Sequence, residues 1–179
     1  SAFAQEAVSI QKFGVLPTNT PQENAVNLQK AIDEMTAKGG ALYVTPVEGG
    51  YPVATGVVLK KNVSLIGVHG PTGRGTRNRA GNGPTGSLFV ITDTLKPFIT
   101  VESATQIRGI QFWYPQQTFD NPDKIIPYKP TIKMAAEGII EGVTLSCLSF
   151  YGEYMAMDFR TPGKDFCEQI LCEHCYGYP

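Results

Sequence analysis

The chain has 179 residues, of which 42% are hydrophobic, and a formal net charge of −1. This length and composition are typical of one domain with a buried core and exclude extensive disorder. The balanced charge gives no electrostatic case for a nucleic-acid partner, and the apolar runs are too short for a membrane span.

Residues 1–7 are predicted to be a signal-peptide remnant or a disordered N-terminus. Ala2-Phe3-Ala4 matches the small-x-small pattern that precedes a signal-peptidase cut, which favours a secreted, periplasmic or cell-surface protein. The alternative is a chance match, or a cloning scar at Ser1-Ala2. Residues 8–179 are then expected to form a single domain.

One amphipathic helix is predicted near the N-terminus. Thr20 is the N-cap, Pro21 suits the first helical position, and Glu23 can reach back to the cap. An apolar face follows, and Gly39-Gly40 ends the helix. The residues of that face are Leu28, Ala31, Ile32 and Met35. We expect this helix to cover one end of a stack of strands.

The rest of the chain is predicted to be short strands, rich in Val, Ile, Phe and Thr, separated by turns and two longer loops. The loops are 69–86 and 115–130. The strands are 42–44, 57–59, 63–68, 88–91, 98–101, 107–112, 131–134, 143–150, 155–159 and 170–172.

A loose repeat in the second half predicts how these strands pair. Segments 107–112, 140–145 and 167–172 align, and stacking them gives three apolar columns. Arg108, Glu141 and Glu168 share a further column, which is interpreted as an Arg-Glu ladder on the surface, with Glu141 and Glu168 as a carboxylate pair for glycoside hydrolysis as the alternative. Equivalent strands must run parallel, yet no helical crossover separates them. A chain that winds as a coil of strands resolves this conflict. The apolar columns are Ile107/Ile140/Cys167, Ile110/Val143/Ile170 and Phe112/Leu145/Cys172.

The order of motifs over residues 8–68 resembles the N-terminal entry segment of the pectin-lyase-like superfamily. This resemblance implies a mainly β protein, a right-handed parallel β-helix with an N-terminal capping α-helix. The family's acidic loop is replaced here by 16–21 (LPTNTP). The matching segments are 13–15 (FGV), 28–33 (LQKAID), 38–44 (KGGALYV), Pro46, 50–51 (GY) and 62–67 (NVSLIG).

The resemblance also implies a carbohydrate-active protein that acts on, or binds, a polysaccharide or oligosaccharide. Hydrolases, lyases and tailspike-like adhesins share this fold, and fold alone does not choose among them. The polygalacturonase signatures are missing, so no catalytic residue is transferred. One hypothesis is the N-terminal part of a glycoside hydrolase or polysaccharide lyase that is inactive by itself. The alternative is a non-catalytic glycan-binding or adhesion module.

Six residues are candidate substrate-binding groups. Guanidinium groups bind carboxylates bidentately, which suits an acidic sugar, and aromatic faces can stack on sugar rings. A solvated basic loop and ordinary core packing are the alternatives. The candidates are Arg74, Arg77, Arg79, Trp113, Tyr114 and Tyr151.

Asp158 and Arg160 are weighed as a lyase-type acid and guanidinium, but one pair is too little for that assignment. Both histidines are interpreted as structural. No metal or cofactor is predicted: the four cysteines are first interpreted as core residues, with a disulfide or a metal site as alternatives. No terminal cover follows 170–172, which predicts either C-terminal truncation or self-association through that end.

Overall fold

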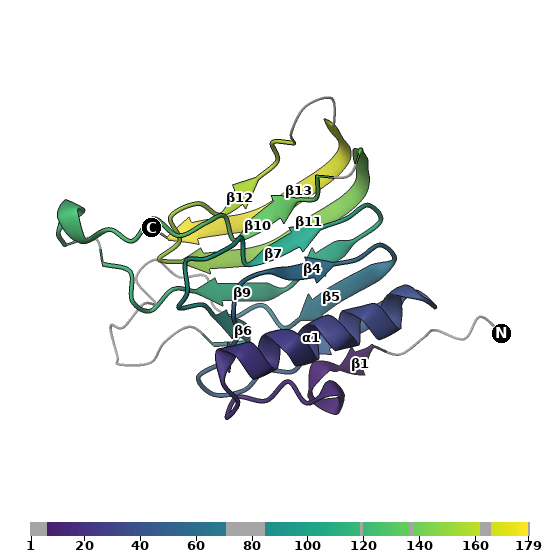
Figure 1. Ribbon diagram of the computed structural model, residues 1–179, viewed down its shortest axis with the longest axis horizontal. Coiled ribbons are helices and arrows are strands. Elements are labelled where there is room, and N and C mark those ends of the chain that lie inside the picture. The colour runs from purple at the N-terminus through teal and green to yellow at the C-terminus, as the bar shows by residue number, and fades with distance from the viewer. Residues whose placement is uncertain (1–6, 71–84, 119, 137, 162–165, 179) are drawn as a thin grey trace.

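The computed structural model describes residues 7–70, 85–118, 120–136, 138–161 and 166–178. The fold is mainly β, with parallel sheets and one α-helix (Figure 1). Every strand pair in the described residues is parallel. Residues 1–7 were predicted to be a signal-peptide remnant or a disordered N-terminus, and all of them except Ala7 lie outside the described residues.

The N-terminal part begins with β1 (Val8–Ser9) and a 3-10 turn (Ile10–Phe13), followed by α1 (Pro21–Thr36). The predicted capping box is confirmed: Thr20 Oγ1 accepts from the Glu23 amide, and the Glu23 carboxylate accepts from the Thr20 amide. The buried face of α1 is the predicted one, with Asn24 added. This face contacts the first strands of both sheets, at one end of the stack (Figure 1).

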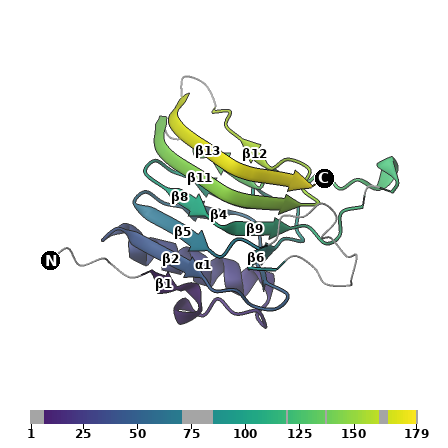
Figure 2. The same cartoon turned by 180° about the vertical axis from the view of Figure 1, so that it is seen from behind.

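The remaining strands belong to a nine-stranded sheet, which also includes β1, and a four-stranded sheet; along the chain, one or two strands of the larger sheet precede each strand of the smaller one. Figure 2 shows β1, β2, β5, β8, β11 and β13 side by side in the larger sheet. Its strands are β2 (Gly40–Val44), β3 (Tyr51–Pro52), β5 (Val63–Gly67), β6 (Ser87–Val90), β8 (Gln106–Arg108), β9 (Ile110–Trp113), β11 (Ile139–Tyr151) and β13 (Phe166–Tyr178). The smaller sheet holds β4 (Val57–Leu59), β7 (Ile99–Val101), β10 (Ile132–Met134) and β12 (Met157–Asp158).

One continuous apolar core lies between the sheets and is sealed at one end by α1. Its centre is a group of phenylalanine rings. Phe112 stacks on Phe150 at 5.2 Å and meets Phe98 edge-on at 5.7 Å, and Phe89 lies 5.5 Å from Phe98. Such offset and edge contacts are the favoured aromatic geometries.

The predicted columns are correct where they join segment 140–145 to segment 167–172, but wrong where they join segment 107–112 to segment 140–145. Ile140 pairs with Cys167, Val143 with Ile170 and Leu145 with Cys172, as expected. Ile107, however, pairs with Leu145 rather than Ile140. Glu141 therefore has Glu168 beside it but not Arg108, which pairs with Ser146, so the predicted Arg-Glu column is also wrong.

Left-handed backbone corners explain this error. Residues with positive φ form two columns across the strands of the larger sheet. The first column lies before β2, β5 and β8 and continues within β11 and β13. The second lies between β8 and β9 and continues further along β11 and β13. Gly142 belongs to the first column and Gly109 to the second, so aligning these two glycines in sequence matches different corners. The first column is Gly39, Asn62, Ala104, Gly142 and Gln169; the second is Gly109, Cys147 and His174.

Two neighbouring corners give a matched stability test. Ala104 has φ +54°, where an L-residue is strained by about 1–2 kcal/mol, so Ala104→Gly should stabilise the fold by about 0.5 kcal/mol after the entropy of glycine is subtracted. Gly142 has φ +68° and only ordinary contacts around an added Cβ, so Gly142→Ala should destabilise by about 1 kcal/mol. Urea denaturation measures both, and equal signs for the two variants would contradict the strain argument.

Candidate functional site

A polar surface lies on the outer side of β9, β11 and β13. Ile110, Phe112, Leu148 and Phe150 belong to the core between the sheets. Because side chains alternate along a strand, the residues between and after them face outward. Register places Ser149 between Gln111 and Tyr176, and Trp113 beside Tyr151. We call Gln111, Trp113, Ser149 and Tyr176, together with His69, which packs on them, the outer polar face.

His69 is held on this face by two contacts. Its Nε2 lies 2.8 Å from Ser149 Oγ, and its ring stacks on Tyr176 with centroids 6.3 Å apart. Burial lowers the pKa of His69, which favours a neutral imidazole at neutral pH. A serine and a neutral imidazole can form a nucleophilic pair. Ser149 is fully buried, however, so in this conformation the pair positions the imidazole instead of exposing a nucleophile.

Gln111 brings an unsatisfied donor to the outer polar face. Its Oε1 accepts from the Tyr151 hydroxyl at 3.2 Å, whereas its buried Nε2 has no hydrogen-bond partner in the described residues. An unpaired buried donor costs about 1–3 kcal/mol, so an acceptor supplied by a ligand or a water would be favoured there.

The backbone at Gly70 and Gly86, on either side of segment 71–84, covers Gln111. Ser87 N donates to Val68 O at 2.9 Å and Val68 N donates to Ser87 Oγ at 2.7 Å, which clamps the two flanks of segment 71–84 together. A Cβ on Gly70 would overlap the Thr85 carbonyl and the Gln111 amide, so only glycine fits there. The chain enters and leaves segment 71–84 beside the outer polar face.

The predicted binding residues fall in three different places. Arg74, Arg77 and Arg79 lie outside the described residues. Trp113 is half-buried on the outer polar face. Tyr114 and Tyr151 are buried: the Tyr114 hydroxyl lies 2.6 Å from Thr131 Oγ1 and its ring 4.6 Å from that of Tyr128. Of the three aromatic candidates, Trp113 alone has a partly exposed side chain that could stack on a ligand.

His69, Gln111 and Ser149 were missed as site residues. A signal for two of them exists in the sequence, because Ile110-Gln111-Phe112 and Leu148-Ser149-Phe150 place a polar residue between two core residues at equivalent rungs. Only the correct register makes these two segments neighbours.

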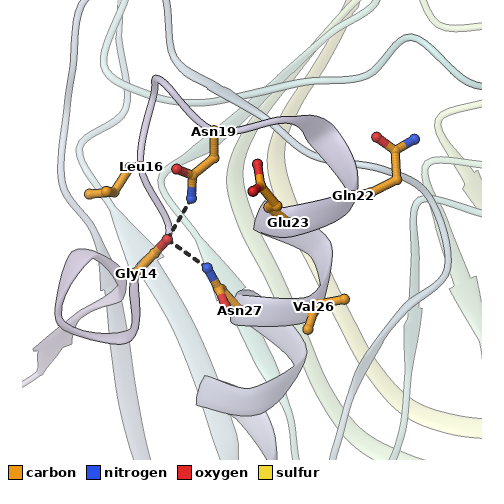
Figure 3. A pocket seen from close by; sticks show the side chains of 7 residues that line it. All are labelled: Gly14, Leu16, Asn19, Gln22, Glu23, Val26 and Asn27. Carbon is orange, nitrogen blue, oxygen red and sulfur yellow. Dashed lines mark hydrogen bonds between the residues drawn. The ribbon is translucent and has the colours of Figure 1, made fainter.

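A hollow of about 600 Å³ lies at the start of α1, away from the outer polar face (Figure 3). Its polar side chains mainly stabilise the preceding loop: Asn19 and Asn27 both donate to the Gly14 carbonyl, at 2.7 and 2.8 Å, and Glu23 is engaged by the capping box. These bonds explain the residues there without a ligand. The lining residues are Gly14, Leu16, Asn19, Gln22, Glu23, Val26 and Asn27.

Asp158 and Arg160 pair with each other and with Lys133. Arg160 Nε and Nη2 donate to the two Asp158 oxygens at 2.8 and 3.0 Å, and Lys133 Nζ lies 3.0 Å from Oδ2. The Arg160 guanidinium, and then Lys133, hold the pKa of Asp158 well below its usual range, against the opposing effect of burial. A carboxylate so strongly ionised is unsuited to act as a general acid near neutral pH.

This cluster predicts a pH dependence of stability. A carboxyl whose pKa is lower in the folded state contributes stability above its unfolded pKa of about 3.9, and loses it as pH falls through the folded pKa. The unfolding free energy of the wild type should therefore fall more steeply below about pH 4 than that of Asp158→Asn. Since 78% of the Arg160 side chain is exposed, solvent screening moderates the effect. Urea denaturation across this pH range, with exposed Asp120→Asn as control, tests it; parallel curves would contradict it.

Within the described ranges, no helix is long and apolar enough to cross a membrane. In the same residues, no group of three or more His, Cys, Asp or Glu side chains is placed to hold a metal ion.

Comparison with known proteins adds little to this picture. No family model matches the sequence, and no curated protein matches it. A crystal structure from Parabacteroides merdae ATCC 43184, of a protein named as a candidate glycosyl hydrolase, aligns over 97% of this chain and 98% of its own. With a TM-score of 0.34 and 10% identity, this similarity is too distant to assign a fold or a function.

Proposed function

We propose that the chain is a saccharide-binding, exported right-handed parallel β-helix of the pectin-lyase-like type. The motifs over residues 8–68 support this fold, as do the parallel pairing of every described strand and the two columns of left-handed corners. The observation that carries the binding role is the partly exposed side chain of Trp113 on the outer polar face, which also carries the exposed ring of Tyr176.

The ligand we expect is an oligosaccharide with an acidic character. The rings of Trp113 and Tyr176 offer flat surfaces for a sugar. Arg74, Arg77 and Arg79 belong to the segment whose flanks meet beside this face, and guanidinium groups suit uronate carboxylates.

The single tryptophan makes this proposal directly measurable, because Trp113 is the only fluorophore of its kind in the chain. Titration with oligogalacturonides should change its emission saturably, and a neutral oligosaccharide of equal length should bind more weakly. By calorimetry, Trp113→Ala should weaken binding about tenfold, equivalent to about 1.4 kcal/mol.

Tyr154→Ala is the matched control, since Tyr154 is an exposed aromatic outside the outer polar face. The proposal fails if no acidic or neutral oligosaccharide alters the emission, or if Tyr154→Ala weakens binding as much as Trp113→Ala.

A catalytic role in a hydrolase or lyase and a purely adhesive role both remain compatible with this binding face. We favour binding, because the strongly ionised Asp158 and the buried Ser149 are unsuited to catalysis as described. Release of reducing ends or of unsaturated uronates by the purified chain would favour an enzyme instead.

A further inference from the structure

The last strands carry sulfur atoms close together on the side of β13 that faces the other sheet. Cys172 Sγ, on β13, lies 3.7 Å from Cys175 Sγ on the same strand. It also lies 3.7 Å from Met157 Sδ on β12, in the other sheet. All four cysteines of the chain are free thiols.

A backbone corner brings the two thiols to one side. In a straight strand, residues three positions apart face opposite sides. His174, between Cys172 and Cys175, has φ +50° and turns the strand. As a result, Cys172 pairs with the core residue Leu145, and Cys175 with the core residue Leu148. The corner thus presents two thiols toward the same interior space as Met157.

The spacing of these sulfur atoms suits shared coordination. Two sulfur ligands, each about 2.3 Å from one metal ion at an angle between tetrahedral and trigonal, are about 3.8–4.0 Å apart. The two observed separations are within a few tenths of an ångström of that range. Thiolate and thioether donors select soft ions such as Cu(I). Cys172 is exposed, which leaves the cluster open to solvent.

We propose that Cys172, Cys175 and Met157 form a three-sulfur binding site for a soft monovalent metal ion of the Cu(I) class. One ion displaces the protons of the two thiols, which pass to solvent, and binds two thiolates and the thioether without any change of oxidation state. Because thiols bind metal ions as thiolates, uptake of the ion is coupled to the release of protons.

The test uses the full chain, reduced and kept under anaerobic conditions. Ag(I) serves as the redox-inert probe, and Cu(I) is then supplied in competition with a chromogenic chelator. We expect one tightly bound ion per chain, with ultraviolet thiolate-to-metal absorption and release of about two protons. Met157→Leu, which keeps every thiol, and Cys172→Ser should each lower the affinity by about 10–100-fold or more.

Cys167→Ser is the matched control, because the Cys167 thiol contacts the Phe159 carbonyl and not this sulfur cluster. Circular dichroism confirms that each variant is folded. If Cys172→Ser unfolds, the conservative Met157→Leu still decides the question. Unchanged affinity in Met157→Leu, equal loss in Cys167→Ser, or several equivalent ions per chain would overturn the proposal, because each indicates binding by thiols in general.

Discussion

Asn24→Ala should lower the unfolding free energy by about 3 kcal/mol or more, because several buried polar groups would lose their partner. The Asn24 side chain is fully buried and joins three segments. Its Oδ1 accepts from Leu16 N at 2.9 Å, and its Nδ2 donates to the carbonyls of Leu16 and Pro52, both at 2.8 Å. Alanine cannot replace these bonds, and water reaches the site poorly. Urea denaturation followed by circular dichroism measures the loss.

Asn27→Ala is the matched control for Asn24. Asn27 lies on the same helix but is only partly buried, and its side chain donates to the Gly14 carbonyl at 2.8 Å. Its removal should destabilise by about 1 kcal/mol. Equal losses in the two variants would show that Asn24 does not connect the loop, the helix and β3 as described.

Phe112→Ala should destabilise the protein by about 3–5 kcal/mol, the range for removing a buried aromatic ring. Only 1% of Phe112 is exposed, and its ring contacts those of Phe98 and Phe150. It therefore packs β9 against β11 and against the residue that precedes β7, and the cavity left behind cannot be filled by small shifts. The same denaturation experiment measures the loss.

Phe166→Ala provides the comparison for Phe112, since 47% of Phe166 is exposed on β13. Its removal should change stability by no more than about 0.5 kcal/mol, as for most surface substitutions. A large loss at Phe166 would mean that β13 contributes more to the core than its exposure indicates.

Local signals predicted the elements well. The capping box fixed the start of α1 because it depends on residues only three positions apart. The β-branched runs located most strands, but β1 and β3, of two residues each, were missed because neither lies within a longer apolar run. Register was harder to predict, because it depends on which residues adopt left-handed corners. Ala104 and Cys147 occupy such corners without the glycine that would identify them in the sequence.

The site was predicted less well than the fold. Trp113 was found because a large aromatic after a strand is conspicuous, but the same reasoning selected Tyr114 and Tyr151, whose rings are buried. Sequence alone cannot tell an outward aromatic from one covered by a neighbouring loop. His69 and Ser149 are far apart in the chain, and only the folded arrangement brings them to hydrogen-bond distance.

The uniformly parallel pairing has a mechanical consequence. The ladder bonds between neighbouring strands run across the strands, so a force applied across a sheet loads one ladder at a time. Tension on the C-terminal side would peel β13 from β11 before it reached the strands beneath, whereas a force along the strands would load many bonds of a ladder together. The molecule should therefore be compliant under tension across its sheets and stiff under shear along its strands.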